Sequence, residues 1–80
     1  MEKTLRSARQ VELVRFLTEA RITAGLTQSE LAEKIGEHQS FIARLESGQR
    51  RIDVVEVVAL AEAIGFDLHA MIDHVKAAQG

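Results

Sequence analysis

Four glycines divide a chain that contains no proline, and their spacing limits what the chain can fold into. Each follows a stretch of helix-forming residues, where a residue in the left-handed conformation can end a helix. The four are Gly25, Gly36, Gly48 and Gly65. No alternation of apolar and polar residues extends beyond a few positions, so strands are not expected. The 80 residues therefore predict one all-α domain over 1–80.

Five helices are expected, covering about 7–24, 28–35, 38–47, 54–64 and from residue 68 onward. The second and fourth begin with capping boxes, formed by Thr27 with Glu30 and by Asp53 with Glu56. Asp67 is expected to cap the fifth. Apolar residues three and four positions apart give each helix an inward face. These are Leu13, Phe16, Leu17 and Ala20; Leu31, Ala32 and Ile35; Phe41, Ile42 and Leu45; Val54, Val57, Val58, Ala61 and Ile64; and Leu68, Met71, Ile72 and Val75.

The turn between the second and third helices is the feature that points to a function. Only residues 36–38 separate them, and a short turn beginning with Gly makes two helices cross steeply, as in a helix-turn-helix. The third helix then presents Gln39, Ser40 and Arg44 outward. Gln pairs with adenine, Arg with guanine, and Ser with either base. The sequence therefore predicts a helix-turn-helix over about 27–47 that contacts base edges in the major groove.

The stretch LTQSELAEKIGEHQSFIARLESGQRRIDVVEVVALAEAIG resembles the helix-turn-helix domain of the Cro and phage-repressor (XRE-like) family of transcription regulators. The similarity covers about half of the chain. It includes the Leu-Thr-Gln opening, the Leu-Ala pair, the Ile-Gly turn and the Leu-Glu-Ser-Gly end of the third helix. The resemblance implies a five-helix, lambda-repressor-like domain of prokaryotic type that binds double-stranded DNA and regulates transcription as a repressor.

The same resemblance implies roles for particular residues. The base contacts fall on Gln39, Ser40 and Arg44, and the phosphate contacts on Gln28, Gln49, Arg50 and Arg51. Gln28 also contacts Gln39, and Arg21 forms an ion pair with Glu46 that joins the first helix to the third. Two positions depart from the family pattern. His38 replaces the usual Ser or Thr cap and is assigned to a phosphate, and Glu37 replaces an apolar residue and brings negative charge near the DNA.

The charge distribution leaves a second class of function open. The net charge is −2, but residues 52–80 carry one Lys against five acids, while 1–21 and 36–51 are net positive. One face can bind DNA while another is negative, because salt screens charges beyond about 8–10 Å. In the alternative, the acidic third binds a protein partner, as the antitoxin of a toxin–antitoxin pair does, and DNA binding is secondary.

A homodimer is expected because one helix-turn-helix covers few base pairs, and two half-sites are the usual solution. The fourth and fifth helices carry more apolar residues than one small core needs. We place the interface at Met71, Ile72 and Val75. The alternative is that these residues complete the core of the monomer.

Other functions are not favoured by the sequence. His69, Asp73 and His74 are a weak basis for a metal site in a chain without Cys, so no metal or cofactor is expected. No catalytic triad, phosphate-binding loop or paired-carboxylate cleft is visible, so the chain is not expected to be an enzyme. No apolar run approaches the ~20 residues of a membrane span, and the first ten residues do not resemble a signal peptide. A cytoplasmic protein with a flexible arm at 1–6 is expected.

Overall fold

The computed structural model describes residues 7–78, and these form five helices. The helices are α1 (Ala8–Thr23), α2 (Gln28–Lys34), α3 (Gln39–Glu46), α4 (Val54–Ile64) and α5 (Leu68–Ala77). The described part of the chain contains no strand, so the predicted all-α fold is confirmed. The expected arm at 1–6 lies outside the described residues.

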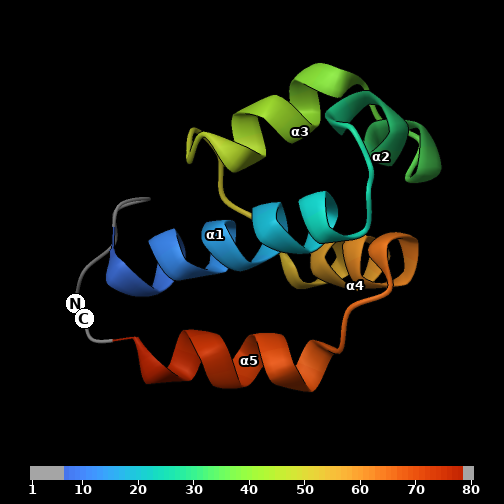
Figure 1. Ribbon diagram of the computed structural model, residues 1–80. Helices are drawn as coiled ribbons and strands as arrows, with labels where there is room; N and C mark the ends of the chain where they lie inside the picture. Colours follow the sequence, from blue (N-terminus) through green and yellow to red (C-terminus); the bar gives the residue numbers. More distant parts are fainter. Residues whose placement is uncertain (1–6, 79–80) are drawn as a thin grey trace.

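The long helix α1 is the element around which the others are arranged. It crosses the middle of the molecule, with α2 and α3 on one side and α5 on the other (Figure 1). It packs against α3, α4 and α5, while α2 packs against α3 and α4. The α2–α3 pair therefore packs on α1 and α4, and α3 has one face left for solvent.

The helix ends follow the predicted caps. The Thr27 hydroxyl accepts from the Glu30 amide, and the Glu30 carboxylate accepts from the Thr27 amide, at 3.0 and 2.8 Å. Asp53 and Glu56 make the equivalent pair of bonds at 2.8 and 3.1 Å. All four internal glycines have positive φ, as expected for residues that end helices.

The core lies between α1, α3 and α4, and all five helices contribute to it. Its buried side chains are Leu17, Leu31, Ala32, Phe41, Ile42, Leu45, Val57, Leu60 and Met71. The inward face expected for α4 was partly wrong, because Val54 is 77% exposed and Val58 is also exposed. The buried stripe instead follows Val57, Leu60 and Ala61. Val55, the neighbour of Val54, is also exposed, so both of the first two residues of α4 lie at the surface.

Candidate nucleic-acid interface

The outer face of α3 is the candidate interface. Gly36 has a φ of +74°, and after it the chain turns so that the Glu37 amide donates to the Ala32 carbonyl oxygen at 2.9 Å. The first turn of α3 follows at once. Phe41, Ile42 and Leu45 are buried, as predicted. The opposite face of the helix is exposed and carries Gln39, Ser40 and Arg44.

The side chain of Arg44 is available to bind DNA. Its side chain is exposed and makes no hydrogen bond or ion pair within residues 7–78; only its carbonyl oxygen accepts, from Ser47 and Gln49. A guanidinium in this position can approach the two acceptors of a guanine without first losing a protein contact.

Gln39 is held by a hydrogen bond to the preceding helix. Its Nε2 donates to Oε1 of Gln28 at 2.7 Å. The contact between these two residues that the resemblance implied is therefore present. The Nε2 of Gln28 in turn donates to Oε1 of Glu46 at 2.9 Å. This second bond, between α2 and the end of α3, was not anticipated from the sequence.

Arg21 and Glu46 form the expected ion pair. Nε and Nη2 of Arg21 donate to Oε2 and Oε1 of Glu46 at 2.6 and 3.0 Å. Nη1 of Arg21 also donates to the carbonyl oxygen of Leu26, at 2.7 Å. The hydrogen bond to Glu46 raises the pKa of Arg21, and burial opposes the rise only in part. The pair fastens both the end of α3 and the loop before α2 to α1.

Arg50 has a different environment from the one expected. Its guanidinium makes two hydrogen bonds to Glu56, at 2.9 and 3.1 Å, and lies 4.5 Å from the centre of the Phe41 ring. The hydrogen bond with Glu56 raises the pKa of Arg50 and lowers that of Glu56. Glu37 contributes a smaller electrostatic effect on Arg50. Its charge is therefore paired within the protein while its side chain stays 32% exposed, and the phosphate contact expected of Arg50 stays a prediction.

The remaining residues assigned to phosphates lie around the ends of α3. His38 precedes the helix, is exposed and makes no capping hydrogen bond. Gln49 and Arg51 follow the helix, and both are exposed. The Gln49 amide donates to the Arg44 carbonyl oxygen at 2.9 Å, which fixes the start of this loop against α3.

The three residues assigned to a dimer interface do not share one surface. Met71 is only 4% exposed and belongs to the core, so its assignment to the interface was wrong. Of the other two, Ile72 is exposed and Val75 is half-buried. The larger exposed apolar group is on α4, where Val54, Val55 and Val58 lie.

The residues considered for a metal site are used otherwise or lie apart. Nε2 of His74 lies 2.9 Å from Oε1 of Glu12, and its ring is also close to Phe16. Within residues 7–78, no three His, Asp or Glu side chains come together in a way that could hold a metal ion. In the same residues, no helix is both long and apolar enough to cross a bilayer.

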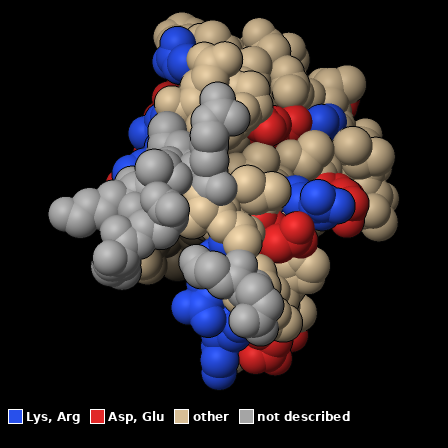
Figure 2. Space-filling model, turned by 90° about the vertical axis from the view of Figure 1, so that its left-hand side faces the viewer, with Lys and Arg blue, Asp and Glu red and all other residues tan. Residues whose placement is uncertain are grey.

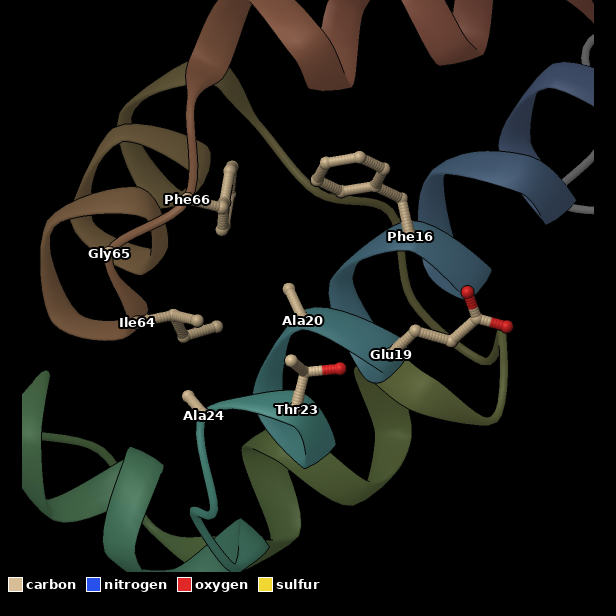
Figure 3. Close-up of a pocket in the computed structure, with 8 residues that line it drawn as sticks. All are labelled: Phe16, Glu19, Ala20, Thr23, Ala24, Ile64, Gly65 and Phe66. Carbon is tan, nitrogen blue, oxygen red and sulfur yellow. The ribbon is translucent and has the colours of Figure 1, made fainter.

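A hollow of about 360 Å³ lies on another part of the molecule (Figure 3). Residues of α1 form one wall and the α4–α5 connection forms the other; they are Phe16, Glu19, Ala20, Thr23, Ala24, Ile64, Gly65 and Phe66. The rings of Phe16 and Phe66 meet edge to face at 5.4 Å. No residue of α3 lines the hollow, so it is separate from the candidate interface.

Charge is mixed over the surface that Figure 2 displays. Basic and acidic side chains lie next to one another on this face, and neither sign forms a large block. Because salt screens charges beyond about 8–10 Å, the net charge of −2 does not decide whether the outer face of α3 can approach DNA.

Comparison with known proteins gives a consistent result. A helix-turn-helix family model matches residues 17–70. The chain is similar to an XRE-family like protein from Pseudomonas syringae, with 41% identity over 88% of this chain and 85% of that one, and a TM-score of 0.81. It is also similar to the restriction-modification controller protein C.AhdI from Aeromonas hydrophila, with 31% identity over 76% and 88% of the two chains, and a TM-score of 0.70.

A more distant structure has the same fold. The restriction-modification controller C.Esp1396I, described as a tetramer in complex with its natural 35 base-pair operator, is 18% identical over 94% of this chain and 93% of that one, with a TM-score of 0.70. None of the curated proteins matches the chain at a significant level.

Proposed function

The chain belongs to the XRE-type helix-turn-helix family of DNA-binding regulators, and on this premise we propose that α3 reads a specific operator in the major groove. The observation that carries the proposal is the outer face of α3. Three side chains able to contact base edges are exposed there, and the apolar side of the same helix is locked into the core. A regulator that occupies an operator acts most simply as a repressor, and we place this action in the cytoplasm.

Each of the three side chains has a distinct role in the proposal. Arg44 donates to the O6 and N7 acceptors of a guanine. Gln39 contacts an adenine with its amide, and Ser40 contacts either a base edge or the adjacent phosphate. Gln39 and Ser40 lie in the first turn of α3, which is the part of a recognition helix that enters the groove first.

Phosphate contacts would fix the register of α3 on the duplex. We assign them to Gln28 and His38, which lie at the starts of α2 and α3, and to Gln49 and Arg51 in the loop that follows α3. Arg50 supports this loop from within, through Glu56 and Phe41. Contacts of this kind position the protein but carry little sequence information.

A homodimer remains part of the proposal, with a different interface. Val54 and Val55 are 77% and 78% exposed, and Val58, one turn later, is also exposed. Contiguous apolar side chains at the surface of a small soluble domain mark an association site. We place a two-fold interface on this part of α4. The two recognition helices would then lie about 34 Å apart and contact half-sites with centres ~10 base pairs apart.

Protein binding as the main function is not favoured. It was suggested by the acidic residues of 52–80, but one of them, Glu56, is paired with Arg50, and two others, Asp53 and Asp67, cap helices. An enzymatic function stays outside the proposal, because the family acts by binding. We treat 7–78 as one helix-turn-helix unit.

Selection of bound sites from random duplexes, followed by footprinting of the selected sequence, tests the function. We expect an inverted repeat whose affinity is many times that for random DNA and falls steeply with salt. Equal affinity for all duplexes would contradict sequence-specific regulation. Co-purification of a second protein, together with absence of DNA binding, would support the alternative.

A further inference from the structure

Four side chains form a continuous line of hydrogen bonds from α1 to the DNA-facing side of α3. Arg21 donates to Glu46, Gln28 donates to Glu46 at 2.9 Å, and Gln39 donates to Gln28 at 2.7 Å. We call Glu46, Gln28 and Gln39 the amide relay. Its inner end is nearly buried, with the Glu46 side chain 8% exposed, and its outer end reaches the candidate interface.

The chemistry of Glu46 fixes the direction of every bond in the relay. An ionised carboxylate accepts hydrogen bonds and has none to donate. Gln28 must therefore turn its NH₂ group toward Glu46, and its carbonyl oxygen is left to face Gln39. Gln39 must then turn its own NH₂ group toward Gln28. One N–H and the carbonyl oxygen of Gln39 remain available to a base.

We propose that Glu46 is a specificity-determining residue, which selects the base that Gln39 contacts although it does not reach the DNA itself. This inference rests on the proposed function. With one donor and one acceptor available, Gln39 matches adenine, which offers a donor at N6 and an acceptor at N7. With the amides reversed, Gln39 would present two N–H donors, which match the O6 and N7 acceptors of guanine.

The bidentate pair between Arg21 and Glu46 gives the relay its rigidity. Both carboxylate oxygens are held by Arg21, and Oε1 is shared with Gln28. The carboxylate is therefore fixed in place before DNA binds. A side chain with both a donor and an acceptor at position 46 would allow Gln28 and Gln39 to take either orientation.

Glu46→Gln tests the relay, because it keeps the size of the side chain and adds a donor. The base pair read by Gln39 is first identified as the one whose preference is lost in Gln39→Ala. Affinities are then measured on operators that carry each of the four base pairs at that position. Wild type should prefer adenine to guanine by about 5- to 150-fold, the range of one good bidentate contact. Glu46→Gln should lose most of this ratio and keep its preferences at all other positions.

Two further variants make the outcome decisive. Glu33→Gln makes the same charge change at an exposed position of α2 and should retain the wild-type ratio. If circular dichroism shows that Glu46→Gln is unfolded, Gln28→Met interrupts the relay while keeping the ion pair, and should lose the ratio as well. A folded variant that retains the ratio, or that weakens binding equally at every position, would overturn the proposal. So would a Gln39→Ala variant with unchanged preferences. Wild type that binds all duplexes alike would instead refute the proposed function.

Discussion

Arg21, in the last turn of α1, and Glu46, the last residue of α3, meet in a two-pronged ion pair that is almost closed to solvent. Their side chains are 12% and 8% exposed, and the two hydrogen bonds are 2.6 and 3.0 Å long. A buried pair adds little net stability compared with a well-packed apolar contact, because both charges lose their hydration. Removing one partner destabilises the fold strongly, because the charge of the other partner is then buried without an opposite charge.

Arg21→Ala should therefore lower the free energy of unfolding by about 3–5 kcal/mol, a large part of the total for a small domain. Urea denaturation followed by circular dichroism measures the change. Arg15→Ala is the control, because Arg15 pairs with Glu12 at 3.4 Å on the surface of the same helix and should cost less than about 1 kcal/mol. If the free energy of unfolding falls by the same small amount in both variants, Arg21 and Glu46 are exposed to solvent and the prediction is wrong.

The pair between Arg50 and Glu56 predicts a dependence of stability on pH. Arg50 lowers the pKa of Glu56 in the folded state, so the carboxylate binds a proton less readily there than in the unfolded chain. The stabilisation is complete above the unfolded pKa and is lost as the pH falls through the folded pKa. Glu56→Gln keeps a side chain that can close the capping box but removes the charge.

We expect Glu56→Gln to be less stable than wild type at pH 7, and the difference to shrink from about pH 5 downward, just above the ordinary pKa of Glu. Unfolding free energies measured between pH 7 and pH 3 test this. Glu62→Gln, at an exposed position of the same helix, should differ from wild type by a small amount at every pH. A difference between wild type and Glu56→Gln that stays constant across the range would contradict the prediction.

The helices and their ends could be predicted because their causes are local. Thr27 and Asp53 reach only three residues along the chain for their capping partners, and the spacing of Phe41, Ile42 and Leu45 fixes which face of α3 is buried. Family resemblance supplied what spacing could not, namely the pairing of Arg21 with Glu46 across 25 positions.

The remaining features depend on how the elements pack. Arg50 meets Glu56 only because the loop after α3 turns back beside the start of α4, and no rule of helical spacing relates these positions. Met71 and Ile72 are adjacent apolar residues of α5, yet the core covers the first and not the second. The bond between Gln28 and Glu46 joins the start of α2 to the end of α3, which requires the crossing of the two helices to be known.

Arg44→Ala should weaken binding to the operator by about 1–3 kcal/mol and remove the preference at one base pair. The reason is that Arg44 is exposed on α3 and has no side-chain partner within residues 7–78 to keep it from a guanine. Affinities for operators with single base-pair changes measure the effect. Lys76→Ala, on α5, should leave the preferences unchanged. If Arg44→Ala weakens specific and random DNA by the same factor, Arg44 contacts only the backbone.

Arg51 and Arg50 are adjacent but should behave differently. Arg51→Ala should reduce the slope of log K against log salt by about one unit, because one phosphate contact is lost. Arg50→Ala should mainly lower the free energy of unfolding, by about 1–2 kcal/mol, since Glu56 loses its partner and Phe41 its cation. Binding titrations over a range of salt concentrations separate the two effects. An unchanged slope for Arg51→Ala would exclude it from the phosphate contacts.

Val55→Asp should give a folded monomer that binds the operator weakly, because a carboxylate in the centre of a two-fold apolar interface faces its own copy. Sedimentation and operator titration measure both effects. Ile22→Asp, which changes an exposed apolar residue of α1 outside the proposed interface, should remain dimeric. Met71→Asp should instead unfold the chain, because Met71 is 4% exposed in the core. If the wild-type protein stays monomeric at high concentration and occupies a single half-site, the proposed dimer is refuted. If Val55→Asp remains dimeric, the interface does not lie on α4.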